Sequence, residues 1–193
     1  MNPFFAYLNR LKLIRRWGLM RNTVPENDME HSMQCAVIAH GLAVIARERH
    51  KRDVNPEHVL SLALYHDVGE VITGDLPTPV KYKNPDIKTA YKTIEAMASE
   101  QLLAMLPTDL RPAYRDYLRP DEGTYEWKLV KAADRICAYI KCIEEQNLGN
   151  REFDQAKQGI MDTIRDNALP EVAEFMAEFI PSFELSLDQL SKL

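Results

Sequence analysis

Residues 55–70 read NPEHVLSLALYHDVGE, and this stretch decides the fold that the sequence predicts. Asn55 followed by Pro56 is typical of a helix start, with Asn as the N-cap and Pro at the first helical position. The apolar residues that follow have helical spacing, which places His66 on the inward face and Asp67 beside it near the helix end. An imidazole and a carboxylate at this position are candidate metal ligands.

Two further residues of the same chemistry lie on predicted apolar helix faces. A capping-box pattern at Asn27 and Glu30 starts a long helix with His31 on its apolar stripe. A second long helix, over about 125–149, carries Asp134 within its stripe. Two imidazoles and two carboxylates form a mixed nitrogen and oxygen donor set, which suits a hydrolytic manganese, cobalt, iron or zinc ion better than a thiolate-bound structural zinc.

Each of these residues has an ordinary structural interpretation when it is taken alone. Asp134 could form an ion pair with a buried arginine such as Arg135 or Arg16, and His31 could be a hydrogen-bonded core histidine. Satisfying all four residues separately would need several independent partners, whereas one metal ion satisfies them together. We therefore predict a metal centre formed by His31, His66, Asp67 and Asp134.

Composition indicates an ordinary cytoplasmic domain. The chain has 193 residues, of which 46% are apolar and 27% charged, which suffices for one core and one domain over 1–193. Its 24 Lys and Arg residues against 29 Asp and Glu give a net charge of -5, which argues against binding nucleic-acid polymers. The cysteines and the apolar runs predict where the protein is found. The three cysteines (Cys35, Cys137 and Cys142) form no CxxC pair, which is typical of a protein from a reducing compartment. No targeting segment is apparent, and the longest apolar run is too short to span a membrane.

The remaining segments also have a helical period, so the predicted fold class is all-α. Residues 1–17 are predicted to form a helix, and residues 74–81 a rigid loop because two prolines interrupt them. Further helices are predicted from Asn84 to about Met105 and then to about Leu118. Two or three more helical patterns follow, over Phe153 to Ile164, Glu171 to Ile180, and in a last turn after Ser186. No alternating strand pattern or internal repeat is visible.

The order of one His, then His-Asp, then a distant Asp resembles the HD-domain superfamily of metal-dependent phosphohydrolases. Within it, the stretches 66–70 and 73–81, together with Arg16-Trp17, look like the bacterial 5′-deoxynucleotidases. The resemblance covers essentially the whole chain. It implies a single HD-type domain, usually homodimeric, that hydrolyses deoxyribonucleoside 5′-monophosphates to the deoxyribonucleoside and phosphate.

Residue by residue, the resemblance implies one divalent ion on the four predicted ligands, most often cobalt or manganese, with zinc, iron and copper as alternatives. It makes Glu70 and Asp75 catalytic, without deciding which carboxylate acts on the water and which on the leaving O5′. Arg16 becomes a phosphate clamp and Trp17 a wall against the sugar. The residues implied to bind substrate are Arg16, Trp17, His66, Asp75, Thr78, Pro79, Val80, Lys81 and Asp134.

Other readings within and outside the superfamily remain open. Dinuclear phosphodiesterases and oxygenases need additional histidines between the His-Asp pair and the last Asp, and this chain has none between His66 and Asp134. A triphosphohydrolase acting on deoxynucleoside triphosphates is the enzymatic alternative, and a non-catalytic nucleotide-sensing module is the alternative from another class. The remaining histidines (His40, His50 and His58) are not predicted to be ligands, and Cys35 and Cys137 are interpreted as small apolar core residues.

Overall fold

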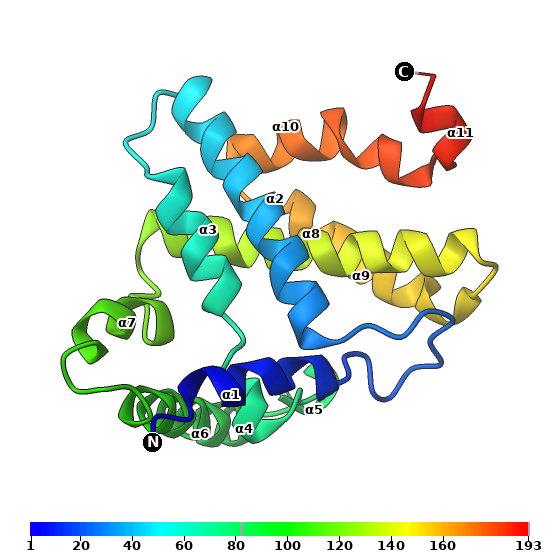
Figure 1. Cartoon of the computed structure of the whole chain (residues 1–193). Helices are drawn as coiled ribbons and strands as arrows, with labels where there is room; N and C mark the ends of the chain where they lie inside the picture. Colours follow the sequence, from blue (N-terminus) through cyan, green and yellow to red (C-terminus); the bar gives the residue numbers. More distant parts are fainter. Residues whose placement is uncertain (82, 193) are drawn as a thin grey trace.

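The computed structural model describes residues 1–81 and 83–192, and the regular elements in this part of the chain are helices (Figure 1). The prediction of an all-α fold is therefore confirmed. The α-helices are α1 (Phe4–Leu8), α2 (Asp28–Glu48), α3 (Pro56–Tyr65), α4 (Glu70–Thr73), α5 (Thr78–Lys81), α6 (Pro85–Ala104), α7 (Arg111–Leu118), α8 (Tyr125–Asn147), α9 (Asp154–Arg165), α10 (Pro170–Glu178) and α11 (Leu187–Leu190). Short 3₁₀ segments are η1 (Asn9–Leu13), η2 (Arg151–Phe153) and η3 (Ile180–Glu184).

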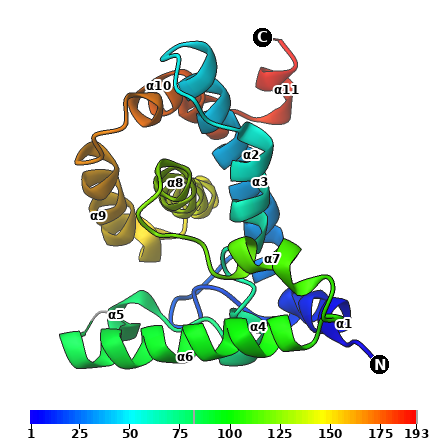
Figure 2. The same cartoon turned by 90° about the vertical axis from the view of Figure 1, so that its left-hand side faces the viewer.

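Helix α8 is the centre of the larger hydrophobic core. Seen along its axis in Figure 2, α2 and α3 lie on one side of it, α9 on the other and α10 above. Leu42 of α2, Val59 of α3 and Ile136 of α8 are all fully buried in this core. A helix buried on several sides needs apolar residues around most of its circumference, and α8 has them.

A second, smaller core lies below, where α6 supports α1, α4 and α7 (Figure 2). Phe4, Leu102 and Leu103 are buried in it, and Val68 joins them. Ala63, five residues before Val68, belongs to the larger core. The chain between these two residues carries His66 and Asp67, so the predicted ligands lie where the two cores meet.

The caps predicted from the sequence are confirmed. Asn27 and Glu30 form the capping box of α2, and Asn55 accepts a hydrogen bond from the backbone N–H of His58 at the start of α3. The same arrangement recurs at Asn84 before α6. Gly149 follows α8 with a φ of +81°, the left-handed conformation that ends many helices.

The prediction of one helix over residues 1–17 is wrong beyond η1. The backbone there pairs with the segment that precedes α2, because the Arg16 N–H donates to the Glu26 carbonyl (3.1 Å) and the Asp28 N–H donates to the Ile14 carbonyl (3.2 Å). Trp17 then takes a φ of +57°, which a helix does not allow. Long-range pairing has overridden the local apolar spacing.

The predicted loop over 74–81 is correct only up to Pro77. Residues Thr78–Lys81 form the single turn α5, in which the N–H groups of Val80 and Lys81 donate to the Pro77 carbonyl. Pro79 fits because the first turn of a helix leaves its N–H groups without helical partners. Within the described residues, no helix combines the length and the apolar character that crossing a membrane requires.

A buried ion pair fastens the segment before α2 to α8. Lys141 donates to Glu145, and the backbone N–H groups of Thr23 (2.8 Å) and Val24 (3.1 Å) donate to the same carboxylate. Burial alone would raise the pKa of Glu145, but Lys141 and these N–H groups lower it from 4.5 to about 2. The carboxylate therefore stabilises the folded chain above pH 4.5, and this contribution is lost as the pH falls towards 2.

Replacing Glu145 with Gln is expected to destabilise the protein by about 3 kcal/mol at pH 7, the free energy that corresponds to this pKa difference. Urea unfolding at pH 7 and pH 3 measures the effect, and the difference from the parent protein should shrink at pH 3. Glu144→Gln, at an exposed position of the same helix, is the control. A loss of stability that is equal at both pH values would contradict the assignment to the carboxylate charge.

Candidate metal centre

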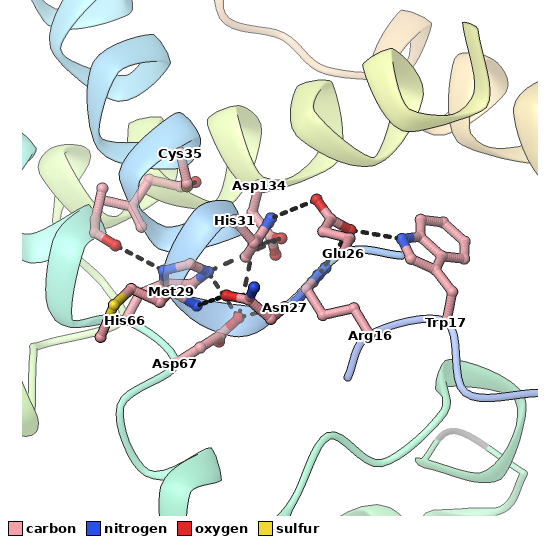
Figure 3. A network of polar contacts seen from close by, with 12 residues as sticks. Arg16, Trp17, Glu26, Asn27, Met29, His31, Cys35, His66, Asp67 and Asp134 are labelled. Carbon is pink, nitrogen blue, oxygen red and sulfur yellow. Dashed lines mark hydrogen bonds and ion pairs between the residues drawn. The ribbon is translucent and has the colours of Figure 1, made fainter. Parts of the chain in front are cut away.

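Three helices bring the four predicted ligands together (Figure 3). His31 lies in the first turn of α2, His66 is the C-cap of α3 with Asp67 next to it, and Asp134 lies midway along α8. Their ligand atoms all lie within 4.8 Å of one another. His31 Nε2 is 3.3 Å from Asp134 Oδ1 and 3.6 Å from Asp67 Oδ2, and His66 Nε2 is 3.0 Å from Asp67 Oδ2. The predicted convergence is confirmed.

The imidazoles are oriented as metal ligands. His66 Nδ1 lies 2.7 Å from the Ala63 carbonyl and donates its proton there, so Nε2 is the ring nitrogen that faces the cluster and would bind a metal. The buried Nε2 atoms of His31 and His66 have no hydrogen-bond partner among the described residues. A nitrogen lone pair that faces a carboxylate oxygen is repelled unless a cation lies between them. The donor set and its geometry therefore fit a divalent cation.

The charges of the cluster also favour a bound cation. Burial alone would lower the pKa of His66, but Asp67 and Asp134 outweigh it and raise the pKa well above the usual range. Burial would raise the pKa of both carboxyl groups. His66 nevertheless keeps the pKa of Asp67 well below its usual value, and Lys131, together with the histidines, does the same for Asp134. The cluster therefore holds two negative charges, which attract either a metal cation or, at His66, a proton.

The cation beside Asp134 is neither Arg135 nor Arg16, the partners considered from the sequence. Lys131 Nζ donates to Asp134 Oδ2 over 2.7 Å, from one turn earlier on α8. This leaves Oδ1, the oxygen that faces both histidines, for a metal. The side chains of Asp67 and Asp134 are 18% and 23% exposed, so the predicted burial of Asp134 is incomplete: the carboxylates face a cleft and the histidines form the wall behind them.

Glu26, which the sequence did not indicate, links Arg16 and Trp17 beside the cluster. Arg16 Nη1 lies 3.4 Å from Asp67 Oδ2, and Arg16 Nε donates to Glu26 Oε2 (3.3 Å). The Trp17 indole N–H donates to the same Glu26 oxygen (2.8 Å), and Glu26 Oε1 lies 4.0 Å from His31 Nδ1. Figure 3 shows Glu26 between the indole and the metal-ligand cluster. Only the backbone pairing of 14–16 with 26–28 makes this contact, so no local motif could reveal it.

Three further carboxyl groups surround Arg16 and Asp67. Burial, assisted by Asp67 and Asp28, raises the pKa of Glu70 to about 11, and burial likewise raises the pKa of Asp28 to about 7 and that of Asp75. Asp28 is fully buried, and neither of its carboxyl oxygens has a hydrogen-bond partner among the described residues. The sequence alone does not indicate Asp28 as a site residue, because an aspartate in a first helical turn is common for other reasons. Protonated carboxyl groups beside a metal centre can donate protons.

A cleft of about 760 Å³ opens over the carboxylates. It contains most of the predicted substrate residues: Arg16, Trp17, Asp75, Thr78, Pro79, Lys81 and Asp134. The predicted ligand Asp67 and the predicted catalytic residue Glu70 line it as well. His66 is buried behind the carboxylates and does not line the cleft. Val80 is 39% exposed and also does not belong to the lining. The opposite wall, which the sequence did not indicate, comes from α8 and α9 and includes Lys131, Arg135 and Ile160. The site therefore combines a metal centre, cations and an apolar wall in one cleft.

Known proteins of one enzyme family are similar to this chain over nearly its whole length. Residues 3–183 match the family described as "5′-deoxynucleotidase YfbR-like". A 5′-deoxynucleotidase of Yersinia pseudotuberculosis serotype I (strain IP32953) is 52% identical over 194 residues, covering 99% of this chain and 98% of that protein. One from Vibrio atlanticus (strain LGP32) is 50% identical over 189 residues, covering 97% of each chain.

The fold is shared with a solved structure. The crystal structure of an HD-domain phosphohydrolase from Listeria innocua superposes with a TM-score of 0.81 at 24% identity, covering 97% of this chain and 91% of that one. The helical architecture is therefore that of the HD-domain phosphohydrolases. With the near-complete match to the family and the half-identical relatives, the chain belongs to the YfbR-like 5′-deoxynucleotidase family.

Proposed function

We propose that this protein is a metal-dependent 5′-deoxynucleotidase that hydrolyses deoxyribonucleoside 5′-monophosphates to the deoxyribonucleoside and orthophosphate. The observation that carries the proposal is the four-residue donor cluster at the base of the cleft, in a chain of the 5′-deoxynucleotidase family. A phosphate monoester carries concentrated negative charge, which a divalent ion beside an arginine neutralises. We propose that the whole chain, 1–193, forms this one phosphohydrolase domain.

His31, His66, Asp67 and Asp134 would hold one divalent ion, for which we propose cobalt or manganese, with zinc, iron and copper as alternatives. When bound, such an ion lowers the pKa of a coordinated water from about 15.7 towards 7 and neutralises phosphate charge. The His66–Asp134 interval contains no further histidine, which supports a mononuclear centre. His66 and Asp134 are also proposed to contact the substrate phosphate, as the family resemblance implies.

The chain's own residues bind the phosphate and move the protons. Arg16 presents N–H groups beside Asp67 in the cleft, where a planar guanidinium can hold two phosphate oxygens. Glu70 and Asp75 line the same cleft without belonging to the ligand cluster. One carboxyl group takes the proton of the attacking water, and the other gives a proton to O5′ as its bond to phosphorus breaks.

The sugar and base would lie along the rest of the cleft. Trp17 supplies an apolar face against the sugar, and Thr78, Pro79 and Lys81 line the cleft near α5. Val80, which belongs to the same turn, is also proposed to contact the substrate, through its backbone. An apolar wall alone rejects an added 2′-hydroxyl by only about a hundredfold, so stronger selection for deoxyribose requires Trp17 to be held rigidly.

The charges in the cleft favour a monophosphate over a triphosphate. Lys131 and Arg135 line the cleft in addition to Arg16 and Lys81. Lys131 is paired with Asp134, however, and Lys81 Nζ lies 2.6 Å from Glu95 Oε1. A triphosphate carries more charge than these paired lysines can match without breaking their ion pairs.

We expect metal-stripped protein to regain phosphate release when single metals are restored, with cobalt and manganese most effective. The test incubates each form with deoxyribo- and ribonucleoside mono- and triphosphates and identifies the products. Orthophosphate from the deoxyribonucleoside monophosphates supports the proposal, whereas tripolyphosphate from the triphosphates indicates the triphosphohydrolase alternative. Nucleotide binding without hydrolysis under any metal would indicate a sensing module.

We further propose that the protein acts as a homodimer in the cytoplasm, as the family resemblance implies. Its three cysteines are free thiols within the described residues, which suits a reducing compartment. Sedimentation equilibrium of the purified protein measures the oligomeric state, and a monomer at micromolar concentration would contradict the dimer.

A further inference from the structure

We propose that Glu26 is a positioning residue that holds Arg16 and Trp17 in one fixed arrangement, and so controls how the enzyme grips phosphate and distinguishes the sugar. The inference rests on the proposed function, because it concerns the substrate of the same cleft. Glu26 itself is absent from the cleft lining and from the ligand cluster. It must therefore act through the residues that it contacts.

The first observation is that one carboxylate oxygen serves two functional side chains. Glu26 Oε2 accepts the Trp17 indole N–H (2.8 Å) and the Arg16 Nε–H (3.3 Å). The backbone of Glu26 adds a third link, because its carbonyl accepts the Arg16 N–H (3.1 Å). The Glu26 side chain is 14% exposed, so these bonds are protected from competing water. The indole and the guanidinium are thereby fixed relative to each other.

The second observation is that Trp17 needs this support. Its φ of +57° lies in the left-handed region that bulky residues rarely adopt, and such a conformation persists only when neighbouring contacts enforce it. Two other residues also contact Trp17. The side chain of Asn22 donates to the Trp17 carbonyl (3.2 Å), and the Phe153 ring packs edge-on against the indole with 5.3 Å between the ring centroids. The hydrogen bond to Glu26 is the contact that fixes the indole N–H and hence the direction of the ring plane.

The third observation concerns what Arg16 would do without Glu26. Arg16 lines the same cleft as the carboxylates of Asp67 and Asp134, which attract its positive charge. With Nε held by Glu26, Arg16 reaches Asp67 through Nη1 only, at 3.4 Å. Released from Glu26, the guanidinium would turn towards the ligand carboxylates, where it competes with a metal ion and no longer faces the phosphate. Glu26 thus limits the contact between the phosphate clamp and the metal ligands to the single one through Nη1.

The test replaces Glu26 with Gln, which has nearly the same shape but no charge. All proteins carry Trp127→Phe, because Trp17 is then the only tryptophan. We expect KM for a deoxyribonucleoside monophosphate to rise about 10- to 100-fold with a smaller fall in kcat, and the preference for deoxyribose over ribose to decrease. In metal-free protein without substrate, Trp17 emission should shift to the red, and calorimetry should show weaker cobalt binding.

The matched control is Glu30→Gln, which removes the same charge four residues away. Glutamine at this position preserves the capping box, and Glu30 contacts neither Arg16 nor Trp17 in any described interaction. This variant should keep the parent KM, sugar preference, emission and cobalt affinity. An unchanged KM together with unchanged Trp17 emission in Glu26→Gln would overturn the proposal.

A double-mutant cycle with Trp17→Phe separates positioning from a general loss of structure. Phenylalanine keeps an aromatic wall but lacks the N–H that Glu26 accepts, so the effects of the two changes on sugar preference should overlap rather than add. Independent, additive effects would refute the coupling. If the parent protein hydrolyses no nucleotide, the proposed function fails, while the emission and cobalt measurements still decide the role of Glu26.

Discussion

Replacing Glu70 with Gln is expected to abolish nearly all phosphate release while the metal stays bound. Glu70 lines the cleft at the first position of α4, and it is not part of the four-residue ligand cluster. Its pKa of about 11 in the metal-free site shows how strongly burial and neighbouring carboxylates favour its protonated form. A glutamine keeps the shape but can neither take nor give the proton, and proton transfer by a positioned carboxyl group typically contributes about 10²- to 10⁴-fold in rate.

The experiment measures both kcat and the bound metal per chain for each variant. Cobalt-loaded Glu70→Gln should retain one metal per chain and bind substrate with a similar affinity, while kcat falls by at least about 100-fold. Glu57→Gln, at an exposed position in the first turn of α3, provides a control with the same change of charge. A variant that keeps more than a tenth of the parent rate, or that loses its metal, would contradict a role for Glu70 in proton transfer.

Replacing Asp134 with Asn is expected to remove both the metal and the activity. The change deletes one of the two carboxylate charges that would neutralise a divalent ion in the cluster. Lys131 then loses its partner 2.7 Å away, and its ammonium group lies beside the vacated ligand position, where it repels a cation. Metal affinity should therefore fall by more than the roughly 10- to 100-fold that follows the loss of an outer-shell partner.

Calorimetric titration with cobalt measures this loss, and thermal unfolding provides an independent readout. A metal that binds only the folded state raises the unfolding temperature of the parent protein, so Asp134→Asn should no longer respond to added cobalt. Glu144→Gln on the same helix should respond as the parent does. Cobalt affinity equal to that of the parent would mean that Asp134 is not a ligand.

Much of this fold could be predicted because its signals are local. The N-caps at Asn27, Asn55 and Asn84 and the left-handed Gly149 each depend on residues within one helical turn. The convergence of the four ligands was also predictable, since burying several polar groups without a common partner would be costly. One metal ion would satisfy all four polar side chains at once.

The predictions from the sequence were wrong or incomplete where segments that are separated in the sequence contact each other. Nothing within residues 1–17 indicates that they pair with 26–28, and this pairing ends the predicted helix and brings Glu26 to Arg16. Lys131 was in principle recognisable, because residues three apart share a helix face whereas Arg135 points about 100° away from Asp134. However, deciding which cation pairs with Asp134 requires knowing how α8 lies against the ends of α2 and α3.

The central position of α8 also constrains when the site can form. This helix fills the larger core and supplies Asp134, whereas the other three ligands lie in the first 67 residues. During synthesis the N-terminal helices, which carry two of the histidines and one of the aspartates, leave the ribosome first. A nascent chain therefore cannot assemble the four-residue set until α8 has emerged, and metal loading is tied to the completion of the core rather than to its beginning.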